Sequence, residues 1–296
     1  MKVLINIATT TDSDFADTLM TSLVSLLENN LDKTFQFFII NDKLTPDDKD
    51  YLDQLKKIYS NIKKIKFVQV NTNYYKKANI NSPGTAIKEN TYYRIELPLM
   101  LPVSRLLYID ADMIYIRDIS GLWNANLHGK PAGAIQEADF GNIEPRLDAL
   151  DIKDRVNGCF NGGLILIDVK QWNKQHITQK AHRFIAQHGS DLTYQDQDAL
   201  NKVLDGNWQH LHPKYNVEPF LLAQPNPDPK RDQLRRQAIQ NPVILHFAGW
   251  GKPWIRTGKW VNPWRNKFYW YQYIASQRLH DYAVNQKPAK KENSVK

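Results

Sequence analysis

The sequence contains a single cysteine, Cys159, among its 296 residues. One thiol cannot form an internal disulfide, and a cysteine-based zinc site needs several of them, so both kinds of cross-link are excluded. Cys159 lies beside apolar residues in the stretch NGCFNGG. We expect it to be buried and without a chemical role, because free cysteine is among the most buried residue types.

Long apolar runs are also absent. No stretch of 18 apolar residues occurs, so the sequence predicts no membrane-spanning helix. The N-terminal MKVLINIATT has an apolar part too short and too mixed with polar residues for a secretory signal peptide, and we expect a cytoplasmic protein. A hydrophobic content of 42% with 24% charged residues is typical of a globular protein. The length suits one large α/β domain or two small ones.

Basic residues outnumber acidic ones, which gives a formal net charge of +8 and a pI of about 9.3. Such a balance favours an anionic partner: nucleic acid, a phosphorylated ligand or an anionic membrane surface. No basic stripe interleaved with aromatic residues occurs before the C-terminal tail, and the tail lacks a known nucleic-acid signature. We therefore expect no nucleic-acid partner.

Short apolar runs alternate with helix-like segments along the chain. Phe15, Leu19 and Leu23 recur at helical spacing, and Thr45 followed by Pro46 marks a helix start. Strand patterns cover residues 3–8, 35–40, 67–70, 106–109, 132–135, 164–167 and 243–247, helix patterns cover 178–187 and 195–204, and a proline-rich loop is expected at 223–232. This alternation predicts an α/β fold with a mostly parallel central sheet flanked by helices. Ligands bind beyond the carboxyl ends of the strands in such sheets.

The composition changes near the C-terminus, so we predict one domain over residues 1–256 and a helical extension over 257–296 that ends in a disordered polar tail. From residue 259 onward there are eight Lys/Arg and two acidic residues, or +6 of the total charge. Trp264, Phe268 and Tyr271 fall at helical spacing. Two interpretations stay open: a basic amphipathic helix lying on the inner face of an anionic membrane, or a terminal helix packed on the first domain.

Two carboxylates stand inside the apolar stretch LLYIDADMIYIRD. Asp110 and Asp112 follow a predicted strand, and residues i and i+2 of an extended segment point the same way. Such a pair can share a hard divalent cation with the oxygens of a substrate diphosphate. The triplet is common by chance, and taken alone it is explained somewhat better by a loop or an ion pair than by a metal site. Whether the apolar run after Asp112 is a strand or an extended link also stays open.

A second stretch, HFAGWGKPW, begins at His246 where an apolar strand ends. Neutral imidazole is a good ligand for a transition-type divalent ion, and the ammonium group of Lys252 suits a phosphate. Gly249 lets the backbone approach a ligand closely. A lone histidine at a strand end is usually structural, but this combination favours a metal and phosphate site.

Three further stretches carry polar residues with alternative explanations. Asn161 in FNGGLILID offers an amide to sugar hydroxyls, or belongs to a turn that leads into a strand. Asp196 and Gln197 in YQDQDALN open a predicted helix, where acidic residues are favourable in any case. Arg94 in ENTYYRIELP could reach a phosphate or carboxylate, or form a surface salt bridge.

Taken together, these five stretches resemble glycosyltransferase family 8, the retaining nucleotide-sugar transferases that include glycogenin and bacterial lipopolysaccharide galactosyltransferases. The resemblance covers residues 3–256 in motif order and spacing. It implies a GT-A type, Rossmann-like catalytic domain that binds a UDP-sugar and Mn²⁺, with Mg²⁺ as the alternative ion. It also implies transfer of galactose or glucose, with retention, to a hydroxyl of a glycan, glycolipid or glycoprotein of the bacterial surface.

The resemblance assigns roles residue by residue. It makes Asp110, Asp112 and His246 the metal ligands. It places Ala8, Thr9, Thr10 and Asp12 at the uridine, Gly249 and Lys252 at the diphosphate, and Arg94, Glu137, Asn161, Asp196 and Gln197 around the donor sugar. Ala111, between the two aspartates, is also counted among the residues that bind the donor. Glu137 stands where the family pattern has aspartate, which leaves the donor-sugar preference open.

The family lacks an agreed carboxylate nucleophile, and none is evident in this sequence. By analogy Gln197 is nearest the reacting face, with Asp196, Asn161 and Lys252 as the other catalytic candidates. We favour a front-face path in which the departing phosphate oxygen helps to deprotonate the acceptor, and in which the metal and Lys252 stabilise the leaving UDP. Two rival functions remain. One is a non-catalytic module that binds a UDP-sugar or a glycan. The other is an aspartate-nucleophile phosphatase, because the stretch YIDADMI loosely resembles the D-x-D motif of that class.

Overall fold

The computed structural model describes residues 3–41, 43–75, 78, 89–138, 140–255 and 261–285. The polar tail that we expected to be disordered, and the residues around 257, lie outside this part of the chain. The predicted boundary between residues 256 and 257 therefore stays a prediction.

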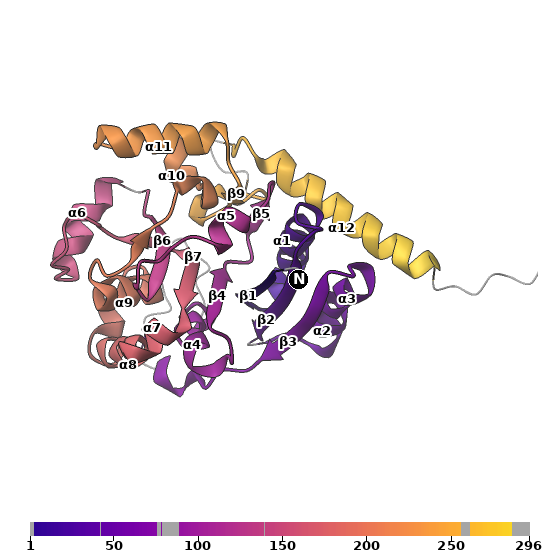
Figure 1. Cartoon of the computed structure of the whole chain (residues 1–296), viewed down its shortest axis with the longest axis horizontal. Coiled ribbons are helices and arrows are strands. Elements are labelled where there is room, and N and C mark those ends of the chain that lie inside the picture. The colour runs from indigo at the N-terminus through magenta and orange to yellow at the C-terminus, as the bar shows by residue number, and fades with distance from the viewer. Residues whose placement is uncertain are drawn as a thin grey trace, which may run out of the picture.

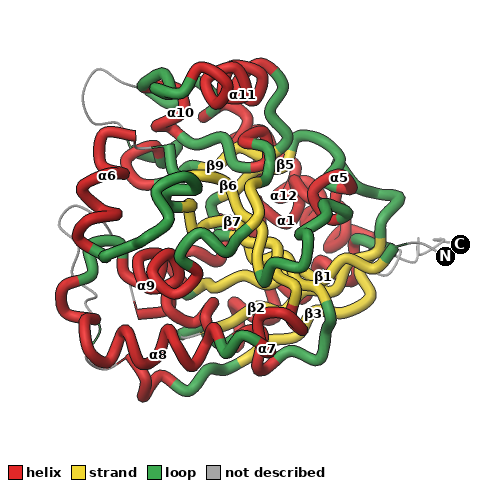
Figure 2. The backbone as a smooth tube through the Cα atoms, turned by 60° about the vertical axis from the view of Figure 1, so that its left-hand side comes forward, coloured by secondary structure: helices red, strands yellow, loops and turns green. Residues whose placement is uncertain are grey.

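A seven-stranded sheet forms the centre of the molecule, with helices around it (Figure 2). Its strands are β1 (Leu4–Thr11), β2 (Thr34–Asn41), β3 (Ile62–Val68), β4 (Arg105–Ile109), β6 (Ala132–Gln136), β7 (Phe160–Asp168) and β8 (Gln209–His210), in the order β3-β2-β1-β4-β7-β6-β8. Every pairing is parallel except those of β7, which is antiparallel to β4 and β6. The predicted α/β fold with a mostly parallel sheet is confirmed.

Helices cover both faces of the sheet (Figure 1). The α-helices are α1 (Ala16–Glu28), α2 (Pro46–Asp53), α3 (Leu55–Ile58), α4 (Leu97–Met100), α5 (Ser120–Trp123), α6 (Phe140–Ala149), α7 (Val169–Lys174), α8 (Ile177–His188), α9 (Gln195–Leu204), α10 (Pro219–Ala223), α11 (Pro229–Gln240) and α12 (Arg265–Asn285). The 3-10 helices are η1 (Ser13–Phe15), η2 (Thr72–Tyr75), η3 (Glu89–Ile95), η4 (Gly189–Asp191), η5 (Pro213–Tyr215) and η6 (Gly249–Gly251).

Alternation along the strands divides the core between these two faces. In β4, Leu107 and Ile109 pack toward α1, whereas Leu106 and Tyr108 pack toward the side of α8 and α9. This is the period-two pattern of a strand buried on both faces. The central strands are therefore almost continuously apolar, and polar side chains are confined to their ends.

A separate two-stranded sheet settles the open question about the run after Asp112. Residues Met113–Tyr115 form β5, which pairs antiparallel with β9 (Ile244–His246) so that Met113 lies opposite His246. The Phe247 amide also donates to the Asp112 carbonyl at 3.0 Å. The apolar run is therefore a true strand, and its pairing brings His246 to Asp112.

Two local expectations were wrong. The second half of the predicted loop at 223–232 is helical: Asp228 caps α11 with its side chain and Pro229 takes the first helical position, where a proline lacks no hydrogen bond. The third strand spans Ile62–Val68 and not residues 67–70. Its lysines face solvent between buried residues on an edge strand, so its first half shows no continuous apolar run.

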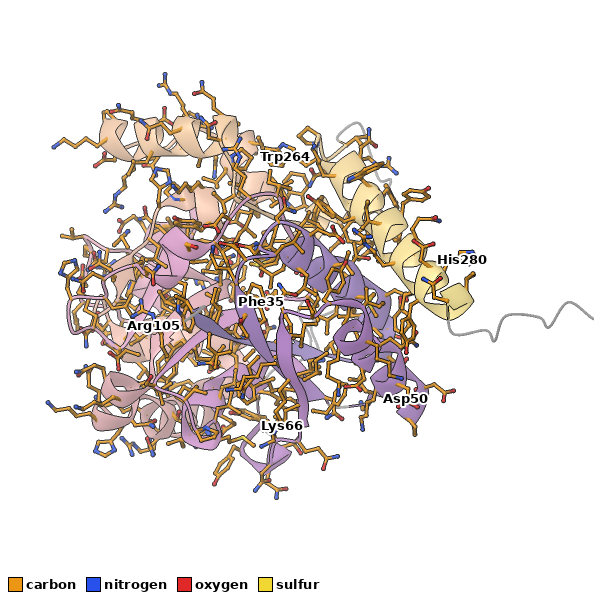
Figure 3. All side chains as sticks on the ribbon, turned by 45° about the vertical axis from the view of Figure 1, so that its right-hand side comes forward. Phe35, Asp50, Lys66, Arg105, Trp264 and His280 are labelled. Atoms are coloured by element: carbon orange, nitrogen blue, oxygen red, sulfur yellow. The ribbon has the colours of Figure 1, made fainter. Side chains whose placement is uncertain are left out.

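The last helix, α12, packs along α1 (Figure 1). Figure 3 shows Trp264 just before its start and His280 near its end, on the outer side of the molecule. Phe268 and Ala275 are buried, and Tyr271 receives a hydrogen bond on its hydroxyl from the Asn29 amide at 2.7 Å. One face of α12 thus packs on the rest of the protein, as the second of the two interpretations of this segment expected.

Candidate functional site

One edge of the sheet carries a cavity of about 940 Å³. The carboxyl ends of β1, β4 and β6 meet there, as expected for parallel strands. Because β7 runs the other way, it is the beginning of β7 that reaches this edge, and Asn161 lies in the strand rather than in the loop that we expected before it.

The structure brings most of the predicted site residues together around this cavity. They are Thr10, Asp12, Arg94, Asp110, Ala111, Asp112, Glu137, Asn161, Asp196, Gln197, His246, Gly249 and Lys252. Ala8 and Thr9 are the exceptions. Strand β1 continues to Thr11, so Ala8 packs in the core and Thr9 is 1% exposed.

A cluster of three side chains forms the centre of the site. Asp110, Asp112 and His246 each offer a ligand atom, and these atoms lie within 4.8 Å of one another. His246 Nε2 is 3.4 Å from Asp112 Oδ1 and 3.8 Å from Asp110 Oδ2. Two carboxylates and an imidazole suit Mn²⁺ or a similar divalent ion.

Gly163 leaves the room that such an ion needs. A Cβ at this position would lie 2.5 Å from His246 Cε1 and 2.9 Å from Asp110 Oδ2. The glycine backbone also holds the cluster, because the Asp110 amide donates to the Gly163 carbonyl at 2.8 Å. The residues present therefore fit a divalent ion.

Lys252 already supplies positive charge to this cluster. Its ammonium group donates to Asp112 Oδ2. Burial alone would raise the pKa of Asp112, but Lys252 and His246 outweigh it and hold that pKa well below its ordinary value. Asp112 is therefore ionised throughout the physiological range and available to a cation.

Arg94 lies between the Asp110, Asp112 and His246 cluster and the carboxylate of Asp196. The buried guanidinium lies 3.4 Å from Asp110 Oδ1 and 2.7 Å from Asp196 Oδ2, and its Nη1 donates to the Gly162 carbonyl. Burial opposes the charge of Arg94, but Asp110 and Asp196 overcome it and raise the pKa of the guanidinium. Arg94 is a buried site residue, not a surface ion-pair residue.

Asp196 has the opposite balance. Burial raises the pKa of its carboxyl to about 6, although Arg94 pulls that pKa down. A carboxyl with such a value in a cavity is a functional candidate. The start of α9 at Gln195 thus places a buried carboxyl with a raised pKa in the lining of the cavity.

Gln197 is held at both ends of its amide. Its Oε1 accepts a hydrogen bond from the Gly162 amide at 2.6 Å, and its Nε2 donates to Glu137 Oε2 at 3.0 Å. Glu137 also lies 3.8 Å from Arg146, which pairs with Asp198 at 2.5 Å. These bonds fix one wall of the cavity.

Sequence reasoning missed several lining residues. Arg146 comes from α6, where its guanidinium stacks 4.3 Å over the ring of Tyr194. No short motif marked Arg146, whereas Tyr194 opens the stretch YQDQDALN. Trp250 and Trp254 lie at the cavity mouth with 42% and 43% of their surface exposed. The two tryptophans in HFAGWGKPW were the available signal for this aromatic mouth.

The sequence model of Glycosyl transferase family 8 matches residues 6–258 of this chain. The chain belongs to glycosyltransferase family 8. This membership removes the support for the aspartate-nucleophile phosphatase, whose likeness rested on the D-x-D stretch alone.

Relatives of this family 8 chain come from several bacteria. It is 31% identical to General stress protein A of Bacillus subtilis (strain 168) over 293 residues, which covers 96% of this chain and 98% of the relative. It is 25% identical to the Lipopolysaccharide 1,2-glucosyltransferase of Escherichia coli (strain K12) over 251 residues, covering 84% and 72%. A galactosyltransferase LgtC crystal structure with donor and acceptor sugar analogs matches with a TM-score of 0.80 at 22% identity, covering 91% of this chain and 96% of that one. This family 8 protein thus has the GT-A fold. Within the described residues, no helix combines the length and apolar character needed to cross a bilayer.

Proposed function

We propose that this family 8 glycosyltransferase transfers a hexose, glucose or galactose, from a UDP-sugar to a hydroxyl of a glycan, a lipid-linked glycan or a glycoprotein, in a reaction that depends on Mn²⁺ or Mg²⁺. The observation that carries the proposal is the Asp110, Asp112 and His246 cluster, which opens into the cavity beside Lys252. It joins a site for a divalent cation to a cationic group that suits a phosphate.

The metal ion would be held by Asp110, Asp112 and His246. A divalent ion there neutralises the diphosphate and stabilises it as a leaving group, typically by several kcal/mol. Lys252 approaches the same point from β9's side and would turn its ammonium group from Asp112 to the phosphates. Gly249, with a positive φ of 53° and open space around its Cβ position, lets the backbone come close to them.

The donor would lie along the row of strand ends. Thr10 near the end of β1 and Asp12 directly after it suit the uridine end, whereas Asn161, Glu137 and Asp196 surround the space for the sugar. This arrangement supports sugar binding through hydroxyl groups, because every one of these side chains is polar. Glu137 lines this space where the family pattern has aspartate, so the proposal names both glucose and galactose as the donor sugar.

The fixed amide of Gln197 supports a front-face path with retention. An amide whose oxygen and nitrogen are both hydrogen-bonded orients neighbouring groups and is not a carboxylate nucleophile. Proton transfer from the acceptor hydroxyl to the departing phosphate oxygen would then need no protein base. Electrostatic stabilisation of the leaving group carries most of the catalysis in this scheme.

A hydrolysis and transfer panel over UDP-sugars, with Mn²⁺, with Mg²⁺ and with EDTA, tests the function. We expect cleavage of UDP-glucose or UDP-galactose only with metal present, and loss of turnover in Asp110→Ala and Asp112→Asn. Mn²⁺-dependent turnover in both variants would contradict the metal site. Binding of UDP without transfer or hydrolysis would favour the non-catalytic module.

We also propose that the outer face of α12 contacts an anionic membrane surface, which would place the protein on the cytoplasmic side of the membrane. Trp270 and Tyr273 are 55% and 54% exposed beside the basic Lys267, and the chain continues into a basic tail. Flotation with liposomes of anionic and of zwitterionic lipid tests this. We expect anionic-only binding that Trp270→Ala with Tyr273→Ala weakens, and no flotation of the full chain would contradict it.

A further inference from the structure

A fully buried asparagine that no motif marked lies directly behind the candidate metal site. Asn216 is 0% exposed and follows η5. The next residue, Val217, bridges to Leu245 of β9: the Val217 amide donates to the Ile244 carbonyl at 3.0 Å, and the His246 amide donates to the Val217 carbonyl at 2.9 Å. Main-chain bonds therefore hold Asn216 at a fixed place beside His246.

The donor and the acceptor atom of the Asn216 amide can be assigned in only one way. The Gly163 amide donates to Asn161 Oδ1 at 3.0 Å, and because a backbone N–H can only donate, that atom of Asn161 is an acceptor. Asn216 Nδ2 donates to the same oxygen at 3.0 Å. Asn216 Oδ1 is thereby turned to His246 Nδ1, 2.8 Å away, and can only accept from it.

The direction of these hydrogen bonds, from Gly163 through Asn161 and Asn216, determines which ring nitrogen of His246 carries the hydrogen. With the hydrogen on Nδ1, the lone pair of Nε2 faces Asp110 and Asp112, at 3.8 Å and 3.4 Å. Two carboxylates on that side would otherwise attract a hydrogen to Nε2, where it would block the ligand atom. The opposite tautomer thus has a physical advantage that Asn216 has to overcome.

We infer that Asn216 is a positioning residue that holds His246 in the tautomer with hydrogen on Nδ1 and so presents Nε2 as the metal ligand. The inference rests on the proposed function, because only a bound divalent ion uses that lone pair. It also makes the FNGG stretch part of the metal site, since the sequence of bonds starts at Gly163 and Asn161. An outer partner of this kind orients a metal-binding histidine, and its loss typically weakens metal affinity about 10–100-fold.

Asn216→Ala tests the inference against Asn30→Ala. Asn30 is 1% exposed and is also bonded at both ends of its amide, to the Leu26 carbonyl and the Ile119 amide, but it lies away from the cavity. Mn²⁺ binding is measured by electron paramagnetic resonance, with and without UDP. We expect Asn216→Ala to bind Mn²⁺ about 10–100-fold more weakly and Asn30→Ala to bind it like wild type. Wild-type Mn²⁺ affinity in Asn216→Ala would overturn the inference.

The tautomer itself is measured on the metal-free wild-type protein, so that the result needs neither bound metal nor turnover. In EDTA at pH 8, ¹⁵N-histidine NMR, with His246 assigned by comparison with His246→Gln, should show Nδ1 as the protonated ring nitrogen. A hydrogen on Nε2 would overturn the inference. Failure of the wild-type protein to bind Mn²⁺ would instead overturn the proposed function, and the two failures are thus distinguishable.

Discussion

At the scale of single residues, the absent side chain of Gly163 matters as much as any functional group. In Gly163→Ala the new methyl group would meet His246 Cε1 at 2.5 Å and Asn161 Oδ1 at 3.0 Å, and both belong to parts of the site that cannot easily shift. We expect Mn²⁺ affinity and UDP-sugar cleavage to fall about tenfold or more. Gly129→Ala, at a turn where nothing lies within 4 Å of the Cβ position, is the control. Equal Mn²⁺ affinity in the two variants would contradict the prediction.

The buried carboxyl of Asp196 should make stability depend on pH. Its pKa rises from 3.8 to about 6 on folding, first because of burial, so the folded state binds the proton more tightly. The stabilisation by this proton is complete below pH 3.8 and is lost as the pH rises through about 6. From pH 5 to pH 7.5, wild type should lose about 1 kcal/mol relative to Asp196→Asn. Urea unfolding in EDTA at both pH values measures this, and a difference that does not change with pH would contradict it.

At the scale of elements, α12 is fixed by one buried side and exposes the other. Phe268 is 2% exposed, and its ring centroid lies 5.6 Å from those of Phe247 and Trp254. Phe268→Ala should lower the free energy of unfolding by about 3–5 kcal/mol. Trp270→Ala, on the exposed side of the same helix, should change it by less than about 0.5 kcal/mol. Similar losses in both variants would show that the two sides do not differ in this way.

The local sequence pattern predicted the helices and strands far better than it predicted which of them pair with one another in space. Periodicity placed α9 at its observed residues, Gln195–Leu204, and marked the strand that ends at Ile109, because both signals lie within a few residues. The reversed direction of β7 and the pairing of β5 with β9 depend on contacts between segments far apart in the chain. No local signal carries them, and the pairing of β5 with β9 is what brings His246 to Asp112.

The same limit applies to the site. Asp110, His246 and Lys252 are reactive types in recognisable spacings, so a resemblance to a family could find them. Arg146 and Asn216 reach the site through α6 and the bridge beside β9, and an isolated arginine or asparagine has no spacing to recognise. Ala8 and Thr9 do not line the cavity for a related reason: the length of β1, and not its composition, decides which of its residues reach the cavity.

At the scale of the whole molecule, one cavity collects the ends of four strands, so a ligand that fills it should stabilise the entire fold. UDP with Mn²⁺ at about 100 times its dissociation constant would add about 2.7 kcal/mol to the free energy of unfolding. We expect the unfolding temperature to rise with UDP and Mn²⁺ together, and to rise less with either alone or with ADP and Mn²⁺. Asp112→Asn should abolish the rise, because the carboxylate that Lys252 and the metal share is lost. A rise of equal size in that variant would mean that the nucleotide binds without this cluster, and the metal site would then have to be sought elsewhere.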